Sequence, residues 1–348
     1  MRKINVAIVG VGSFAKALVE GVAFYTKKPN ETIGLMHPTI GGYKVSDINF
    51  VAAFDVDRRK VGKPLHQALY ADPNVTMKIA EPIKYKAIVH RGPTLDGVHD
   101  ALRKNFIRES SEPISDMAKI LREASVDIIL NFVPSGGELA TYAYAETALK
   151  ANCSFINCIP TPLATVPLWQ KRFKAKKRVL LGDDIKSQLG ATMLNRILLM
   201  FLKLRGIRIL KSEQINTGGN ADHFNLIHRA KSKEKSKKFA LTDFLAAADA
   251  SPTVKFVYTG KSSGHKRVDI QIDGEMFGRV PISINSVIED EISINGAGVV
   301  VDAIRMAKFL VDNNRHNEAW KVCPFLMKSP PVRMSDEEAF RAFEKISG

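Results

Sequence analysis

Short apolar runs alternate with helix-like segments through the first half of the chain. The runs have the continuous apolar character of buried parallel strands and cover residues 4–9, 50–55, 127–133, 154–159 and 178–181. The segments between them repeat apolar residues at helical spacing, and helices are predicted at residues 18–24, 117–124 and 139–151. Strands that alternate with helices predict an α/β fold with a doubly wound parallel sheet and ligands at the strands' carboxyl ends.

The pattern changes after an apolar helical run at residues 193–204. Residues 207–217 and 255–284 alternate polar and apolar side chains with period two, which predicts antiparallel strands. An apolar helix is predicted from residue 296, and a short C-terminal helix follows Ser335. Residues 61–115 are irregular, and their sequence predicts no role.

The turn after the first strand carries a GxGxxA sequence, residues 10–15, between a strand and a helix. Gly10 allows a tight turn, Gly12 lets the backbone approach a pyrophosphate, and Ala15 permits close packing of helix on strand. This context predicts a Rossmann-like dinucleotide site that includes Ser13 and Phe14. Glycines that serve only an ordinary tight turn are the alternative.

Asp55 ends the second predicted strand. In a Rossmann-like fold an acid at this point binds the ribose hydroxyls and favours NAD over NADP, whereas a helix N-cap is the alternative role. Asn131 and Gly136 lie at the end of one later strand, and Asn157 and Ile159 lie at the end of the next. We expect these four at the nicotinamide side of the site, because the carboxyl ends of parallel strands share one edge. Pro134 is a further candidate cofactor-binding residue.

Residues 182–192, Gly-Asp-Asp-Ile-Lys-Ser-Gln-Leu-Gly-Ala-Thr, join a short strand to an apolar helix. Two carboxylates, a lysine, a serine and a glutamine therefore stand where a helix begins. Free backbone N–H groups and the positive dipole end of a helix suit an anionic substrate. Asp183, Asp184, Ser187 and Gln188 are accordingly candidate site residues.

Composition narrows the class of protein. The 348 residues include 51 Lys plus Arg against 36 Asp plus Glu, which gives a net charge of +15. A basic protein can bind nucleic acid, but this sequence has no zinc-finger or RNA-binding motif. We therefore expect a solvated basic surface rather than a nucleic-acid partner. No run is long enough to span a bilayer. The three cysteines lack CxxC spacing and predict reduced thiols in a cytoplasmic protein. The eight histidines have no metal-ligand spacing, so no metal site is predicted.

Several motifs together resemble the inositol-3-phosphate synthases of the shorter prokaryotic and archaeal type. The resemblance runs from residue 4 to about residue 331, and the matching pieces are residues 50–57 with 60–62, 182–187, 217–222, 297–302 and 326–331. It implies an NAD-binding domain, a central α+β domain that builds a homotetramer, and C-terminal helices that return to the first domain. We predict that residues 1–190 and 296–348 form the first domain and residues 191–295 the second.

The same resemblance implies an isomerase of the intramolecular lyase class. Such an enzyme cyclises D-glucose 6-phosphate to 1D-myo-inositol 3-phosphate by oxidation, enolisation, intramolecular aldol addition and reduction, with NAD recycled and no net redox change. The chemistry needs a base for the hydroxyl proton, and cationic groups for the enolate and the alkoxide. Buried lysines serve both purposes, because burial and neighbouring charges lower their pKa.

By motif position the family's catalytic residues fall on Lys233, Lys237, Lys266, Lys328 and Asp184. Lys237 and Lys266 are expected to hold the phosphate, Lys233 to transfer protons and Lys328 to stabilise the oxyanion. The substrate contacts that the resemblance implies are Ser187, Gln188, Asn220 and Asp222. The resemblance is also compatible with a divalent or monovalent cation near the substrate phosphate.

The chain departs from the family pattern in two acidic positions. Ser263-Gly-His265 stands where the family often has an acid before the lysine matched by Lys266, and the acids at residues 289–291 are displaced. Three alternatives therefore stay open: a same-family cyclase for a different sugar phosphate, a net dehydrogenase, and a catalytically silent NAD-binding homologue. The four retained lysines argue against the silent homologue.

Overall fold

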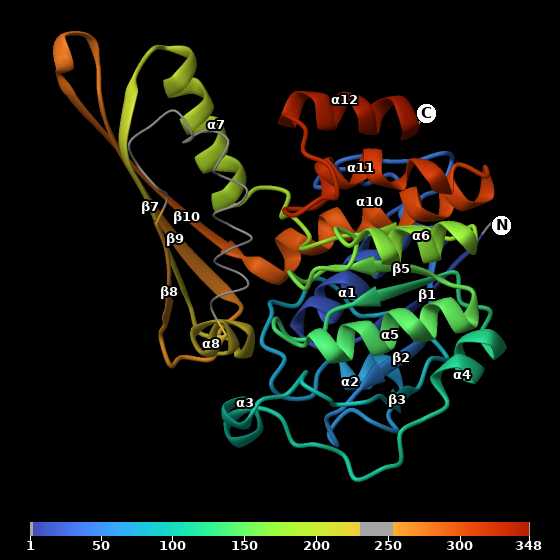
Figure 1. Cartoon of the computed structure of the whole chain (residues 1–348). Helices are drawn as coiled ribbons and strands as arrows, with labels where there is room; N and C mark the ends of the chain where they lie inside the picture. The colour runs from blue at the N-terminus through green and yellow to red at the C-terminus, as the bar shows by residue number, and fades with distance from the viewer. Residues whose placement is uncertain (1–2, 230–252, 348) are drawn as a thin grey trace.

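The structure is a computed structural model that describes residues 3–229 and 253–347. Two β-sheets dominate it and lie side by side, the smaller one to the left of the main body in Figure 1. No helix in these two ranges has the length and apolar character needed to cross a membrane.

The larger sheet has six parallel strands in the order β3-β2-β1-β4-β5-β6. Their bounds are β1 (Ile4–Val9), β2 (Ile48–Asp55), β3 (Val89–Arg91), β4 (Ile128–Asn131), β5 (Ser154–Asn157) and β6 (Leu180–Leu181). The winding direction reverses between β1 and β4, so a crevice for ligands opens at the carboxyl ends of these strands. The predicted doubly wound α/β fold is confirmed.

Helices cover both faces of this sheet because its strands are apolar on both sides. Successive residues of β1 alternate, with Val6 and Ile8 packing on one face and Ala7 and Val9 on the other. The first face is covered by α1 (Ser13–Lys27), α10 (Ile292–Asp312) and α11 (Ala319–Leu326). The second face is covered by α4 (Met117–Glu123), α5 (Glu138–Ala151) and α6 (Pro167–Ala175).

The smaller sheet has the order β10-β9-β7-β8. Its strands are β7 (Arg208–Gly218), β8 (Thr253–Tyr258), β9 (His265–Glu275) and β10 (Pro281–Glu291). The apolar side of α7 (Ala191–Leu204) packs on it around Leu199, Val268 and Ile270. The β9–β10 hairpin extends away from the main body in Figure 1.

One part of the strand prediction is wrong. β7 pairs with β9 and β9 pairs with β10 in antiparallel fashion as predicted, but β8 runs parallel to β7. Period-two alternation reports which face a side chain takes and carries no information on strand direction. The connection between β7 and β8, which begins with α8 (Ala221–His228), has the length that a parallel crossover needs.

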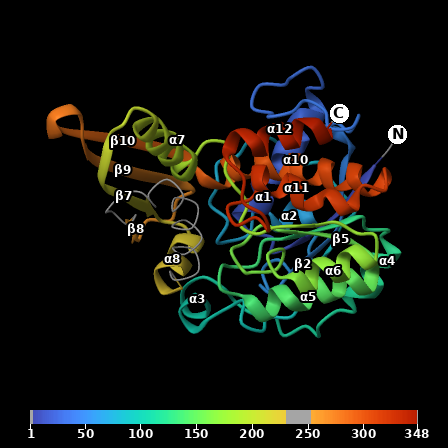
Figure 2. The same ribbon diagram turned by 45° about the horizontal axis from the view of Figure 1, so that its top comes forward.

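The chain returns to the larger sheet through α10, which begins at Ile292 rather than at the predicted residue 296. α10 packs along α1, and α12 (Asp336–Ser347) packs on α11. Figure 2 shows these C-terminal helices together over the side of the sheet that carries α1. The C-terminal return predicted from the sequence is confirmed, whereas the domain boundaries at residues 190 and 296 stay a prediction.

The segment without a predicted role, residues 61–115, holds α2 (Leu65–Ala68), β3 and α3 (Asp100–Asn105). Its loops lie beyond the carboxyl ends of β1 and β2, and several of its residues line the cavity described below.

Candidate active site

A cavity of about 290 Å³ lies at the carboxyl ends of β1, β2 and β4, where the smaller sheet meets the larger one. Twelve of the residues that the sequence singled out line it, namely Gly10, Gly12, Ser13, Phe14, Asp55, Pro134, Ile159, Ser187, Asn220, Asp222, Lys266 and Lys328. These residues are more than 300 positions apart at the extremes, and the fold alone brings them together. Lys233 and Lys237 lie outside the described residues.

The glycine turn has the shape that a pyrophosphate site requires. Gly10 has a φ of +86°, and a Cβ atom there would lie 2.7 Å from the carbonyl oxygen of Phe132. Gly12 faces open space, with nothing within 4 Å of a Cβ built on it. α1 begins at Ser13 without a side-chain cap, so its first N–H groups are available at the cavity. These features fit a dinucleotide.

Two substitutions separate the structural glycine from the binding glycine. Gly12→Val should leave the free energy of unfolding within about 1 kcal/mol, because its φ of −93° suits any residue. The valine side chain would nevertheless fill the open space, and we expect NAD affinity to fall by about 100-fold or more. Gly10→Val should instead destabilise the fold by about 2 kcal/mol or more, through its positive φ and its clash. Calorimetric NAD titration and urea unfolding of both variants test this, and a stable Gly12→Val protein with undiminished NAD affinity would contradict it.

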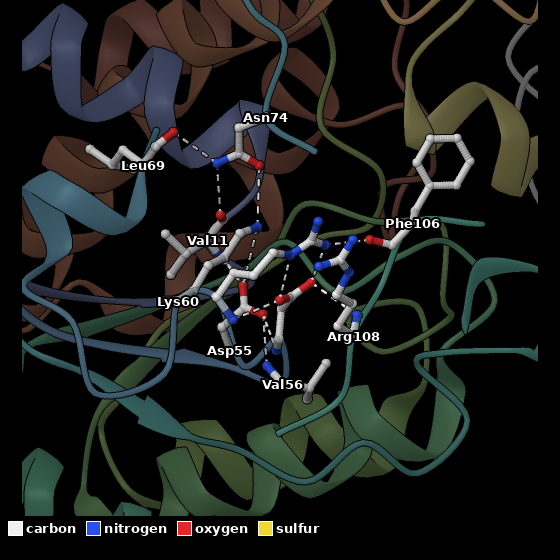
Figure 3. A network of polar contacts seen from close by, with 10 residues as sticks. Val11, Asp55, Val56, Lys60, Leu69, Asn74, Phe106 and Arg108 are labelled. Carbon is white, nitrogen blue, oxygen red and sulfur yellow. Dashed lines mark hydrogen bonds and ion pairs between the residues drawn. The ribbon is translucent and has the colours of Figure 1, made fainter. Parts of the chain in front are cut away.

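The Asp55 side chain, at the end of β2, accepts a hydrogen bond from the backbone of the glycine turn (Figure 3). Its Oδ2 accepts the Val11 N–H at 2.7 Å, and its Oδ1 accepts the N–H groups of Val56 and Asp57 at 2.7 and 2.9 Å. The Lys60 Nζ lies 3.9 Å from Oδ2. Since each carboxylate oxygen has two acceptor sites, Oδ2 can also accept a ribose hydroxyl.

Part of the cavity wall is apolar. Pro93, Val98, Leu102 and Ile107 contribute to it. Such a wall suits the flat face of a purine base. It comes from residues 61–115, for which no role was predicted. Three of these residues lie in loops and Leu102 lies in the six-residue helix α3, which is too short for a clear periodic signal, so sequence patterns could not identify them.

The predicted nicotinamide-side residues divide into two groups. Pro134 and Ile159 line the cavity, whereas the Asn131 side chain is buried and donates to Asn157 Oδ1 at 2.9 Å. Asn157 in turn donates to Asp183 Oδ1 at 2.7 Å, and burial raises the pKa of Asp183. The Asn131 and Asp183 side chains therefore brace the strand ends rather than line the cavity.

Three further predicted residues also lie off the cavity. Ala15 is fully buried where α1 packs on the sheet, and Gly136 faces the side chain of Arg229. Gln188 points away and donates from Nε2 to the Gly34 carbonyl at 2.6 Å. Ala15 takes the packing role predicted for it, whereas Gly136 and Gln188 show that the surroundings of a motif residue depend on tertiary packing.

A second helix start opens on the cavity. α7 begins at Ala191 with no side-chain cap, and Ser187, Gly190 and Ala191 all line the cavity. Asn220 caps α8, because its Oδ1 accepts the His223 N–H at 2.8 Å. The cavity thus has the uncapped start of α1 at one side and that of α7 at another, and each favours an anionic group.

Lysines supply the positive charge beside α7. Lys328 Nζ lies 3.2 Å from Oδ1 of Asp184 and donates to the Ile185 carbonyl at 2.7 Å. Asp184 is fully buried and does not line the cavity itself, so it acts there through Lys328. Lys266 on β9 is 8% exposed and lines the cavity. Carboxylate pairing keeps the Lys328 ammonium in one place.

Lys186, the lysine of residues 182–192, was not among the candidate site residues but also lines the cavity. Its Nζ donates to the Pro324 carbonyl at 2.7 Å and lies 3.6 Å from Asp336 Oδ1. Burial lowers the pKa of Lys186 to about 8, while the Asp336 carboxylate opposes that shift. The sequence could have indicated Lys186 as a site residue, because it lies between the candidates Asp184 and Ser187. The whole stretch joins a strand to a helix at the cavity.

No three His, Cys, Asp or Glu side chains gather as a metal site would require within residues 3–229 and 253–347. A cation near the substrate phosphate stays a prediction. Cys153 and Cys323 are buried, and burial raises the pKa of each thiol to about 12, so neither is a ready nucleophile.

Comparisons with known proteins identify the family to which this chain is similar. The family model described as myo-inositol-1-phosphate synthase matches residues 190–291. The chain is 39% identical to the inositol-3-phosphate synthase of Mycolicibacterium smegmatis, over 97% of this chain and 96% of that protein. It is 38% identical to the inositol-3-phosphate synthase of Corynebacterium glutamicum, over 98% and 97%.

The fold has a close match among solved structures. A myo-inositol-1-phosphate synthase-related protein from Thermotoga maritima superposes with a TM-score of 0.81 at 23% identity, over 99% of this chain and 98% of that one. At this identity the match supports the fold alone. Together with the near-full-length sequence identity above, it leads to one conclusion: the chain belongs to the inositol-3-phosphate synthase family.

Proposed function

We propose that this protein is an NAD-dependent inositol-3-phosphate synthase, an isomerase that converts D-glucose 6-phosphate to 1D-myo-inositol 3-phosphate. Membership of the family supports this activity. The observation that carries it furthest is a single cavity lined by the start of α1, the start of α7 and the two lysines Lys266 and Lys328. Such a cavity suits two anionic ligands at once, a dinucleotide and a sugar phosphate.

The cofactor would lie across the carboxyl ends of the larger sheet. Gly12 and Ser13 would hold its pyrophosphate at the start of α1, and Asp55 would accept a ribose hydroxyl. Pro134 would adjoin the nicotinamide, with Asn131 and Asp183 bracing the strand ends behind it. When bound, NAD supplies a hydride acceptor that oxidises one carbinol carbon and later returns the hydride.

The substrate phosphate would lie at the start of α7. Ser187 and the free N–H groups of that helix would donate to the phosphate oxygens. Lys266, on β9 of the smaller sheet, would add positive charge. Asn220 and Asp222 would face the sugar hydroxyls, since both line the same cavity. Lys237 is proposed as a second phosphate lysine on the resemblance alone.

Cyclisation requires charge to develop on oxygen twice, in an enolate and in an alkoxide. Lys328 is the proposed electrophile, because Asp184 fixes its ammonium group at the cavity wall before the reaction begins. Lys233 is proposed for the proton transfers at the oxidised carbon, again on the resemblance. The lowered pKa of Lys186 would let this buried lysine exchange protons near neutral pH.

Incubation of the purified protein with a panel of sugar phosphates tests this function. Conversion of glucose 6-phosphate to inositol phosphate without NADH accumulation supports the proposal. Turnover of a different hexose phosphate would favour the altered-substrate cyclase, which the changed acids at residues 263–265 and 289–291 motivate. Net NADH would indicate a dehydrogenase, and no turnover of any substrate would indicate a silent homologue.

We also propose that the protein assembles as a homotetramer through the smaller sheet and α7. Apolar side chains stay exposed along this helix, namely Ile197, Met200, Phe201 and Leu204. An exposed apolar stripe of this kind favours burial against another subunit. Light scattering at micromolar concentration should give about four times the chain mass of 38.5 kDa, and a monomeric mass would contradict the proposal.

A further inference from the structure

A second carboxylate, that of Asp57, lies two residues beyond Asp55 and binds the Arg59 side chain. Asp57 is fully buried, and its N–H donates to Asp55 Oδ1 at 2.9 Å. Arg59 Nε donates to Asp57 Oδ1 at 2.9 Å, and Arg59 Nη2 donates to Asp57 Oδ2 at 2.6 Å. This two-pronged arrangement is the strongest form of arginine–carboxylate pair.

Further hydrogen bonds hold Arg59 in this position. Its Nη2 also donates to the Phe106 carbonyl, and its backbone N–H donates to Asp57 Oδ1 at 2.9 Å. The backbone N–H of Arg108 reaches Asp57 Oδ2 at 3.2 Å. The Nε and Nη2 groups of Arg59 are therefore engaged by Asp57 and by the Phe106 carbonyl, which lies just after α3.

The position of this pair bears on cofactor choice. Asp55, Val56 and Lys60 line the cavity, so Arg59 belongs to the loop that borders the ribose end. In Rossmann-like folds an arginine after the second strand accommodates the 2′-phosphate of NADP. Here the arginine is present in that loop but is bound to a neighbouring carboxylate.

Of the other basic residues in this loop, Lys60 is held by contacts of its own. Lys60 is 3% exposed, donates to Asn74 Oδ1 at 3.2 Å and lies 3.9 Å from Asp55 Oδ2. Asn74 itself is fixed, because its amide donates to the carbonyls of Val11 and Leu69 at 3.0 Å each. The Arg58 side chain is exposed.

We propose that the Asp57–Arg59 pair determines the preference for NAD over NADP, with Asp57 withdrawing Arg59 from the place where a 2′-phosphate would lie. Asp55 repels the 2′-phosphate directly, and Asp57 removes the cation that would compensate for that repulsion. The inference rests on the proposed function only in requiring that a dinucleotide binds in the cavity.

The test is the ratio of NAD to NADP affinity, measured by calorimetric titration of the full-length protein freed of cofactor. Asp57→Asn keeps the shape but removes the charge that holds Arg59, and it should improve NADP affinity relative to NAD by about tenfold. The double variant Asp57→Asn with Arg59→Ala should return the ratio to within about twofold of the unmodified protein. A general loss of structure affects both cofactors alike, because they differ only in the 2′-phosphate, and so leaves the ratio unchanged.

Two further variants complete the design. Asp57→Ser, whose hydroxyl can still accept the Arg59 N–H, should shift the ratio in the same direction and serves if Asp57→Asn does not fold. Glu146→Gln is the matched control, since it releases Arg172 from a similar two-pronged pair between α5 and α6, and it should leave the ratio unchanged.

An unchanged ratio in both Asp57 variants would overturn the inference. A gain that persists without Arg59 would also overturn it, because the cation would then be Arg58 or Lys60. Failure of the unmodified protein to bind either dinucleotide would instead refute the proposed function, so the two failures are distinguishable.

Discussion

Replacing Lys328 by methionine should lower kcat for sugar-phosphate cyclisation by about 10²–10³-fold, the usual effect of removing a donor that stabilises a developing oxyanion. The Lys328 ammonium lies 3.2 Å from Asp184 Oδ1 and faces the cavity, whereas the methionine side chain has similar length without charge. NAD affinity should change by less than about twofold, because the proposed ribose and pyrophosphate contacts come from Asp55 and the start of α1 rather than from Lys328. Steady-state kinetics and NAD titration measure the two effects.

Loss of Lys328 also leaves the buried Asp184 without this partner, which could weaken the fold. The double variant Lys328→Met with Asp184→Asn removes both charges, so it should regain stability without regaining rate. Lys321→Met on α11 is the control. That lysine is partly exposed, pairs with Glu318 and does not line the cavity, so the variant should retain full activity. Normal kcat in the Lys328→Met variant would contradict the assigned role.

Replacing Asp302 by alanine should lower the free energy of unfolding by about 3–5 kcal/mol, the range for breaking a buried ion pair. Asp302 and Arg305 on α10 are both fully buried and paired with each other. Arg305 also donates to the backbone carbonyls of His37 and Pro38 at 2.8 and 3.0 Å, and so ties the segment after α1 to α10. Without Asp302 the arginine would keep a buried charge with no carboxylate. Urea unfolding measures the loss.

His37 gives this prediction a second readout. Its hydrogen bond with Asp302 is the main cause that raises the pKa of His37, with Glu344 adding to it. Stability from protonated His37 is therefore full below its ordinary pKa of 6.5 and is lost as the pH rises through the higher folded-state pKa. Asp302→Ala should diminish this pH dependence. Glu123→Ala, which removes an exposed partner of Lys119, should cost less than about 1 kcal/mol, and an equal cost in both variants would contradict the account.

The fold was predictable where local pattern and tertiary structure agree. Strand β1, the glycine turn and α1 form one continuous unit, and the periodicity of residues 4–24 is sufficient to identify it. The parallel pairing of β8 with β7 could not be predicted, since strand direction depends on the route of the connection. The early start of α10 at Ile292 was missed because Ile292–Asn295 continue the polar and apolar alternation of β10.

The candidate site was predictable to the level of segments. The stretch from residue 182 to residue 192 does lie at the cavity, but Gln188 turns to Gly34 and Asp183 is buried beneath the loop at residues 163–165. Motif spacing could not distinguish Ser187, which lines the cavity, from its neighbour Gln188. Arg59 was recognisable as a basic residue near Asp55, but its pairing with Asp57 depends on side-chain geometry that only the structure provides.

Glucose 6-phosphate carrying deuterium at C5 provides the most direct test of the central claim that one cavity holds cofactor and sugar phosphate together through a cycle without net redox change. The account predicts inositol phosphate that retains the deuterium at the corresponding carbon, with no NADH accumulating in solution, because the hydride never leaves the cavity. Stoichiometric NADH with an oxidised sugar phosphate, or inositol phosphate that has lost the label, would contradict it.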